Sequence, residues 1–366
     1  MKGVFLLGLF ALITPSILFL PPTYKSNVVD TEDEGITQKP IEIKKVSVKL
    51  SPHHQQQVVG TDIYYINNLN EAGAGALYCY NTITETNAKV IDGDVVDFVI
   101  NDGRLFYNHY VFPQNNLYVL DLRYNDTPLL ISKDASTDFV FYGNFMYFAR
   151  VNAAEITGTN AIMKVSLDDY AVKLVHNKKS NNLLVHNQKL YFLDGGDTLH
   201  SASFHPTNGD LENFTKLPTP ALTKFKIYNN QFYARRVVTT IVPPFRDPRL
   251  TRYDIDGTNQ KDITDDYDTV DFEILDDKIY FANQVTTNSK DGFYVMPVTG
   301  IEGETATRYG TSRIWPKDIE ILGQYAYFYD YDDTDAIPPV HDGNSQFYRL
   351  DLTNPTDIIA IDEIGI

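Results

Sequence analysis

The 366-residue chain has one cysteine, one tryptophan and a shortage of basic residues. The single cysteine, Cys79, excludes a disulfide within the chain and any zinc site built from several cysteines. Against 48 Asp and Glu there are only 31 Lys and Arg, so the formal net charge is −17. Because such a chain repels polyanions, we exclude nucleic acid and anionic membrane surfaces as partners.

The common catalytic signatures are absent as well. The sequence has no Gly-x-Ser-x-Gly elbow, P-loop or dinucleotide-binding fingerprint. The eight histidines are scattered, and none occurs in a His-Glu-x-x-His pattern. We therefore expect no cofactor, apart from a calcium ion considered below.

Long apolar runs are missing except at the N-terminus. After Lys2, residues 3–20 are apolar, interrupted only by Thr14-Pro15-Ser16. The run is long for a secretion signal, has no small-x-small cleavage site, and is near the lower limit for a spanning helix. A cleaved export signal, an uncleaved anchor and a misassigned start all remain open. We expect an extracytoplasmic protein, secreted or anchored by residues 3–20, that meets membrane only there.

Residues 21–45 are expected to form a flexible linker. The segment includes Asp30-Thr31-Glu32-Asp33-Glu34, and residues 28–42 contain no aromatic side chain. Such a composition cannot bury enough apolar surface to order itself. Residues 46–366 then form the folded domain, and Val46, Val48 and Leu50 alternate with polar residues as in a strand.

One short pattern dominates that domain and is clearest at residues 270–281. Val270, Phe272 and Ile274 alternate with acids, as in a strand with one buried face. Asp276-Asp277 is a turn sequence, and Ile279-Tyr280-Phe281 begins a second strand.

The pattern occurs seven times, and each copy has an apolar–aromatic pair in its second strand. The seven aromatic residues are 42, 41, 44, 42, 47 and 47 residues apart. They are Tyr64, Phe106, Tyr147, Tyr191, Tyr233, Tyr280 and Tyr327. A third strand and a short, more polar fourth strand follow in each copy. This period predicts an all-β, seven-bladed propeller with four antiparallel strands per blade. Ring closure stays open: residues 46–50 either pair with an outer edge or displace residues 358–361.

The turn at residues 254–266, which begins Asp254-Ile255-Asp256-Gly257, resembles the third-to-fourth strand turn of low-density-lipoprotein-receptor-like propellers. Ile63-Tyr64-Tyr65 and Ile279-Tyr280-Phe281 resemble the second strands of relatives of the domain-of-unknown-function 5050 type. The receptor family's Tyr-Trp-Thr-Asp signature is absent, and the only tryptophan, Trp315, lies elsewhere. The resemblance covers about residues 55–363. It implies a propeller fold and recognition of protein or glycan outside the cell, and it implies no catalytic residues.

Two second-to-third strand loops, residues 235–249 and 330–346, are predicted to be long. Each contains Pro-Pro, an apolar residue, a base and an acid. Proline stiffens a loop and lowers the entropy lost when it presents a side chain to a ligand. Rigid connectors without a ligand are the alternative. The candidate ligand-binding residues are Arg235, Arg236, Arg246, Asp247, Arg249, His341 and Asp342.

The arginines of the first loop, with Arg252, form a basic cluster in an acidic chain. Arginine suits carboxylates, sulfates and phosphates, so an anionic glycan or an acidic peptide is a candidate partner. Pairing with local acids is the alternative. The second loop has an acidic run whose oxygens could hold calcium, although it lacks the EF-hand spacing. A solvated acidic loop is the other interpretation. The candidate metal ligands are Asp330, Asp332, Asp333 and Asp335.

From the sequence we therefore expect a recognition module that binds an extracellular protein or anionic glycan through its loop face, without catalysis. A propeller hydrolase or lyase acting on polysaccharide or peptide is the alternative, with Asp247 and Asp342 as its acids. Paired carboxylates of glycosidases lie about 5–10 Å apart. A structural cell-surface protein is the third interpretation.

Overall fold

The computed structural model describes residues 56–67, 75–111, 114–124, 127–133, 138–150, 161–239, 246–264, 269–283, 292–300, 306–309, 316–330, 346–354, 356 and 358–360. The chain divides into two compact units, Met1–Val46 and Ser47–Ile366. All described residues belong to the second unit, and they contain strands but no helix. Accordingly, no helix among them is suited to crossing a membrane. The predicted signal or anchor and the predicted linker, residues 21–45, lie outside the described residues.

The first sheet has seven strands in chain order. They are β1 (Gln56–Val59), β2 (Asp62–Asn67), β3 (Gly75–Asn81), β4 (Thr86–Asn101), β5 (Arg104–Val111), β6 (Gln114–Asp121) and β7 (Leu129–Ser132). The first half of β4 pairs with β3, and its second half, from Val95, pairs with β5. Gly93 lies between the halves with φ +146°, and a Cβ there would meet the His109 ring 2.8 Å away. Glycine thus lets one long strand serve two neighbouring groups of strands.

Five four-stranded sheets follow, each antiparallel. We count β1–β4 and β4–β7 of the first sheet as the first and second groups of strands, so the first four-stranded sheet is the third group. It contains β8 (Val140–Tyr142), β9 (Phe145–Arg150), β10 (Ala161–Ser166) and β11 (Val172–His176). The fourth contains β12 (Ser180–His186), β13 (Lys189–Asp194), β14 (Leu199–Phe204) and β15 (Leu211–Lys216). The fifth contains β16 (Leu222–Tyr228), β17 (Gln231–Thr239), β18 (Arg246–Asp254) and β19 (Lys261–Asp262). The sixth contains β20 (Thr269–Leu275), β21 (Lys278–Asn283), β22 (Gly292–Pro297) and β23 (Thr307–Tyr309). The last contains β24 (Pro316–Leu322), β25 (Tyr325–Asp330), β26 (Gln346–Asp351) and β27 (Ile358–Ala360).

The tight turns between first and second strands are as predicted. Asp276 and Asp277 both have positive φ, and so do Asn229 and Asn230. Two consecutive residues with positive φ are the requirement of a two-residue hairpin turn, which Asn and Asp tolerate better than most residues. These turns fix the hairpin register and therefore decide which face of each strand is buried.

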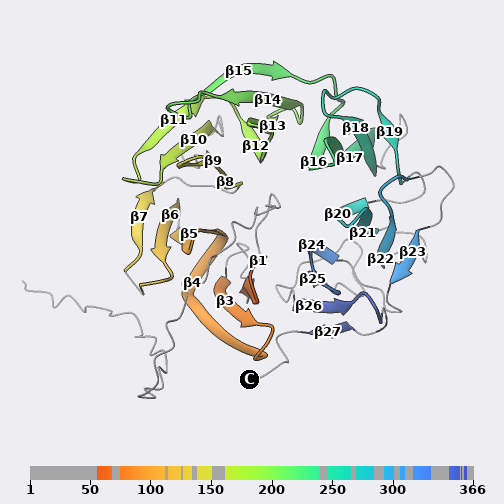
Figure 1. The fold of residues 1–366 in the computed structure, drawn as a ribbon, viewed down its shortest axis with the longest axis horizontal. Coiled ribbons are helices and arrows are strands. Elements are labelled where there is room, and N and C mark those ends of the chain that lie inside the picture. The colour runs from red at the N-terminus through yellow and green to blue at the C-terminus, as the bar shows by residue number, and fades with distance from the viewer. Residues whose placement is uncertain are drawn as a thin grey trace, which may run out of the picture. The chain divides into compact units, whose positions relative to one another are not determined.

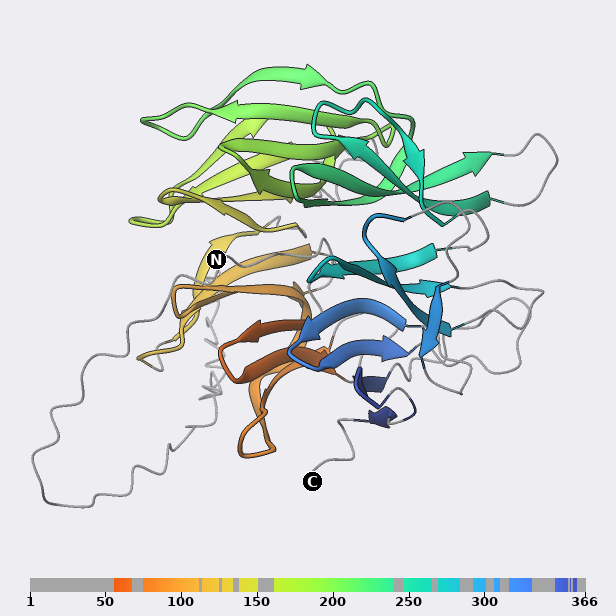
Figure 2. The same ribbon diagram turned by 45° about the vertical axis from the view of Figure 1, so that its right-hand side comes forward.

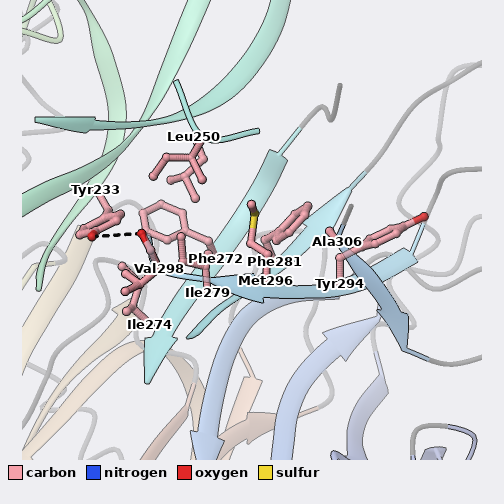
Figure 3. Packing of buried hydrophobic residues seen from close by; sticks show 11 residues of the cluster. Tyr233, Leu250, Phe272, Ile274, Ile279, Phe281, Tyr294, Met296, Val298 and Ala306 are labelled. Carbon is pink, nitrogen blue, oxygen red and sulfur yellow. Dashed lines mark hydrogen bonds between the residues drawn. The ribbon is translucent and has the colours of Figure 1, made fainter. Parts of the chain in front are cut away.

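Successive groups of strands follow one another around a common centre (Figures 1 and 2). They bury their apolar faces against one another. In one such interface, Phe272 and Ile274 of β20 pack with Tyr233 and Leu250 of the preceding sheet. Figure 3 shows this cluster, in which the Tyr233 hydroxyl donates to the Val298 carbonyl oxygen at 3.5 Å. The predicted aromatic residues of the second strands therefore form the core between sheets.

The first and last groups of strands also meet. β1 lies against β24, and Tyr327 packs with Ile63, Tyr65 and Tyr80. β27 pairs with β26 through residues 358–360, so the predicted last strand is present there. Side-chain packing thus joins the two ends within the described residues, while residues 46–50 lie outside them.

Candidate functional site

The first predicted binding loop, residues 235–249, is largely a hairpin. β17 and β18 pair continuously from Gln231 opposite Asp254 to Thr239 opposite Arg246. In Figure 2 this teal hairpin extends beyond the neighbouring strands. Among the described residues, β19 pairs only with Thr251 and Arg252 of β18, and none pairs with Pro248 on that edge, which is where a strand tolerates proline. The expectation of a long loop between Arg235 and Arg249 was wrong for that reason.

Strand alternation divides the predicted arginine cluster between two faces. Arg236 lies opposite Arg249, and Asp247 lies opposite Val238 in the same row. Arg235 lies opposite Leu250 in the other row, with Arg246 opposite Thr239. By backbone register, Arg235 and Arg236 therefore lie on opposite faces of β17.

On the first of these faces, the Asp262 carboxylate of β19 lies close to Arg236 and, at a longer distance, to Arg249. The Nη2 of Arg236 lies 2.7 Å from its Oδ2, and the Nη1 of Arg249 lies 3.9 Å from the same atom. The Thr251 hydroxyl donates to Oδ1 at 2.9 Å. Burial raises the pKa of the neighbouring Tyr253 to about 12, opposed by the charge of Arg236 and reinforced by that of Asp262. Here the alternative interpretation, pairing with local acids, describes Arg236.

The remaining candidate residues fall at the limit of the described chain or beyond it. Asp330 is the last residue of β25, opposite Gln346. Asp332, Asp333, Asp335, His341 and Asp342 lie outside the described residues. Within the described ranges, no group of three or more His, Cys, Asp or Glu side chains is arranged to hold a metal ion. The calcium prediction stays a prediction.

The sequence interpretation missed a set of buried ion pairs on the inner strands. Lys224 pairs with Asp271, and Lys226 pairs with Glu273. All four side chains are 12% exposed or less. Each lysine comes from β16 and each acid from β20, which lie towards the centre in Figure 1. These pairs join two sheets where their first strands approach.

The two carboxylates are further satisfied by backbone groups. Oδ1 of Asp271 accepts from the Phe272 N–H at 2.8 Å, and its Oδ2 accepts from the Ile319 N–H of β24 at 3.2 Å. Oε1 of Glu273 accepts from the Ile274 N–H at 2.8 Å. Fully bonded carboxylates of this kind fix the positions of strands and are poorly placed to exchange protons with a substrate.

Polar side chains link other inner strands in the same way. Oδ2 of Asp138 accepts from the Asn182 N–H at 2.9 Å, and the Asn182 amide donates to the Thr223 carbonyl oxygen at 3.3 Å. The Gln57 side chain bonds both backbone groups of Ile100, accepting at 2.6 Å and donating at 2.8 Å. Polar side chains in or just before the first strands therefore join neighbouring groups of strands at several points.

Acid should weaken the fold through Asp271. Burial alone would raise the pKa of this carboxyl, but Lys224, Lys226 and the Phe272 N–H outweigh it and hold the pKa below its usual value. A depressed folded-state pKa stabilises the fold above the unfolded value of about 3.9, and this contribution is lost as pH falls through the folded value. Urea unfolding between neutral pH and about pH 3 should show a smaller loss of stability in Asp271→Asn than in the wild type.

The exposed Asp92 provides the control for that titration. Its side chain is 70% exposed, so Asp92→Asn should leave the acid dependence close to that of the wild type. An Asp271→Asn variant that loses as much stability in acid as the wild type would show that Asp271 does not contribute.

One histidine–carboxylate pair is also present. The Nε2 of His200 lies 3.1 Å from Oδ2 of Asp194, and the His200 ring stacks on Phe192. Oδ1 of Asp194 also accepts from the N–H groups of Gly196 and Thr198. The pair has the histidine–carboxylate arrangement that also occurs in nucleophilic triads.

Comparison with solved structures identifies the fold. No protein-family model and no curated protein matches the sequence. The β-propeller domain of the Trilobed protease from Pyrococcus furiosus matches with a TM-score of 0.58 and 11% identity, over 87% of this chain and 98% of that chain. Puromycin hydrolase matches with a TM-score of 0.60 and 12% identity, over 88% of this chain and 55% of that chain. The acylaminoacyl peptidase of Pyrococcus horikoshii matches with a TM-score of 0.55 and 10% identity, over 87% of this chain and 54% of that chain.

The chain thus spans about half the length of the two latter enzymes. These similar structures are those of hydrolases or of a protease domain. They contradict the main functional prediction from the sequence, a recognition module without catalysis, and agree better with its alternative, a propeller hydrolase. At these identities the likeness itself shows the fold alone, and the chain is an all-β protein with a β-propeller fold.

Proposed function

We propose that this chain is the propeller of a peptide hydrolase. The observation that carries the proposal is the match to nearly the whole propeller domain of a protease, at 98% of that domain's length. Matches to about half of puromycin hydrolase and of an acylaminoacyl peptidase support it, because each of these enzymes is named for a hydrolytic activity. Since one fold hosts many activities, the proposal needs a test of activity.

The finer architecture belongs to the same proposal. Seven clusters of buried apolar residues occur among the described residues, each between successive groups of four strands. β4 contributes one half to each of two such groups. Both features support seven blades, the first two of which share β4. Export through residues 1–20 remains our proposal for localisation.

In this proposal, the groups that cleave the peptide are not the buried carboxylates of β20, because Asp271 and Glu273 are held by lysines and by backbone N–H groups. We consider two locations. One is the pair of acids named from the sequence, Asp247 and Asp342. The other is a separate catalytic part, as the half-length match to the two hydrolases suggests.

Peptide cleavage by the native protein tests the function. The protein is isolated from its native source without denaturation and incubated with a mixture of short synthetic peptides, and the products are identified by mass spectrometry. We expect hydrolysis that co-purifies with this chain through successive columns. Native preparations that leave every peptide intact would overturn the proposal.

The recombinant 366-residue chain then locates the catalytic groups. If it cleaves the same peptides, Asp247→Asn and Asp342→Asn should each abolish hydrolysis, whereas Asp256→Asn, in an exposed turn, should not. If the chain alone is inactive while the native preparation is active, the catalytic groups belong to a separate part.

A further inference from the structure

The packing between the last and first groups of strands contains a buried hydroxyl without a hydrogen-bond partner. Tyr80 of β3 is 1% exposed, and its hydroxyl oxygen makes no hydrogen bond to the described residues. Its ring packs with Tyr327 of β25, which is also 1% exposed. Because a buried O–H group that donates to no acceptor is costly, an acceptor beside Tyr80 would stabilise this junction.

A cation lies near this hydroxyl. Arg349 of β26 stands opposite Tyr327 in the antiparallel pair, so the two side chains lie on the same face of the last sheet. The Arg349 guanidinium lies 4.7 Å from the centre of the Tyr325 ring. Burial raises the pKa of the Tyr80 hydroxyl, and the positive charge of Arg349 opposes that rise. The guanidinium is thus close to Tyr80 across the junction.

Arg349 has no acidic partner among the described residues. It is partly buried, and none of the ion pairs between described residues includes its guanidinium. An exposed acid, Glu85 in the turn before β4, raises the pKa of Tyr80 but forms no ion pair with Arg349. Partly buried charges are usually paired, and this chain has 48 acids for 31 bases. An unpaired arginine is therefore unexpected here.

The repeat shows which chemical group meets the corresponding cation elsewhere. Lys164 of β10 stands opposite Tyr147, as Arg349 stands opposite Tyr327. The Nζ of Lys164 lies 2.6 Å from Oδ1 of Asp210, which precedes β15 of the next sheet. The third and fourth groups of strands thus place a carboxylate against this cation. Where the last and first groups meet, no described residue supplies a carboxylate to the arginine.

We propose that Arg349 and the Tyr80 hydroxyl together bind a carboxylate at the junction of the last and first groups of strands. The planar guanidinium directs two parallel N–H groups at the two carboxylate oxygens, and the Tyr80 O–H donates to one of them. A singly charged carboxylate fits better than a phosphate dianion, because Arg349 balances one charge and the nearby Glu85 repels a second. The site is independent of peptide cleavage.

Two sources can supply the carboxylate. One is a dissolved organic acid. The other is an acid of this chain, either Glu85 or the pair Asp362 and Glu363, which follows β27 in the sequence. Because Ile359 of β27 stands opposite Arg349, the chain passes the arginine shortly before Asp362.

Saturation-transfer NMR of the full chain with sodium acetate, at neutral pH and constant ionic strength, tests the dissolved source. We expect transfer from the protein to the acetate methyl group, and propionate should displace acetate at a lower concentration than inorganic phosphate does. Arg349→Gln should weaken acetate binding at least about tenfold, because it removes the charge and the paired donors. Tyr80→Phe removes only the hydroxyl and should weaken binding severalfold.

Two matched variants separate the site from general effects. Tyr253 is also 1% exposed with an unbonded hydroxyl among the described residues, but the nearby Arg236 already pairs with Asp262. Tyr253→Phe should therefore leave acetate binding unchanged. Arg123→Gln, at an exposed arginine paired with Asp121, should leave it unchanged too. A thermal melt of each variant shows whether it is folded.

The outcomes distinguish the two sources. Binding by the wild type that both site variants weaken supports the proposal with a dissolved acid. If only Glu85→Gln or the double variant Asp362→Asn/Glu363→Gln binds acetate, and adding Arg349→Gln abolishes that binding, the chain supplies its own carboxylate. The proposal is contradicted if none of these proteins binds acetate, if Arg349→Gln binds it as tightly as the wild type, or if phosphate displaces it more readily than propionate.

Discussion

Replacing Lys226 with Met is expected to lower the free energy of unfolding by about 3–5 kcal/mol. The Lys226 side chain is 11% exposed and its partner Glu273 is 10% exposed. Removing the ammonium leaves a carboxylate in a place with little water to solvate it. That uncompensated buried charge, more than the lost attraction, is the source of the effect.

The surroundings of Lys226 make the loss larger than for an isolated pair. Burial alone would lower the pKa of this ammonium, but the charges of Glu273 and Glu320 outweigh burial and leave its pKa raised. Lys226 therefore compensates acids on both β20 and β24. Denaturant unfolding followed by circular dichroism measures the change, and the slope of the transition checks that the unfolded state is unaltered.

Two variants separate the buried charge from ordinary loss of contact. Lys226→Met combined with Glu273→Leu should recover most of the stability, because a buried pair replaced by apolar residues is often neutral. The part that is not recovered reports on Glu320. Lys89→Met breaks an exposed pair, 44% and 70% exposed, and should change little. If Lys226→Met proves as mild as Lys89→Met, then Glu273 is not held in a dry site.

The repeat predicted the strands well because two independent patterns agree within each copy. Alternating residues such as Val270, Phe272 and Ile274 fix the buried face, and Asp276-Asp277 fixes the turn. When local turn chemistry and side-chain period agree, few other folds are compatible with both. The β-propeller fold and the core between sheets were therefore predictable from the sequence.

Proline misled the interpretation of β17 and β18. Pro243-Pro244 and Pro248 suggested a loop as far as Arg249, although Pro248 lies in a strand. Whether proline is tolerated depends on which side of the strand is unpaired, and that depends on the length of β19 elsewhere in the sequence. A single sequence does not show how far its outer strand extends. The apparent cluster of arginines was a consequence of the same error, because alternation in a strand separates Arg235 from Arg236.

The buried ion pairs, in contrast, could have been predicted from the sequence. Lys226, Glu273 and Glu320 all stand seven residues before the aromatic residue of their copy. Aligning the copies on that residue places opposite charges at the same position of successive copies. The functional class was not within reach, since the repeated residues build the sheets and a fold of this kind carries many activities. That functional prediction was changed by the similar hydrolase structures and not by any residue of the repeat.

Gly209→Ala is expected to be the other severe substitution, at about 2–5 kcal/mol. Gly209 has φ +66°, and a Cβ there would lie 2.6 Å from the Phe145 ring and 2.6 Å from the Tyr147 hydroxyl oxygen. Tyr147 cannot move aside easily. It is fully buried, and its hydroxyl donates to the Gly209 carbonyl oxygen at 2.5 Å. The adjacent Asp210 is held by Lys164, with Nζ 2.6 Å from Oδ1. A methyl group would therefore separate β9 and β10 from the turn before β15.

Gly143→Ala isolates the steric part of that effect. Gly143 has φ +58°, close to the value at Gly209, and a Cβ there would meet nothing within 4 Å. Alanine at 143 thus incurs only the conformational penalty of a left-handed residue, about 1–2 kcal/mol. Thermal unfolding of both variants gives the difference, which measures how tightly Tyr147 and Phe145 pack against the turn. Equal melting temperatures would mean that this contact between sheets yields readily. A much lower value for Gly209→Ala would mean that the third and fourth groups of strands are held tightly together at this turn.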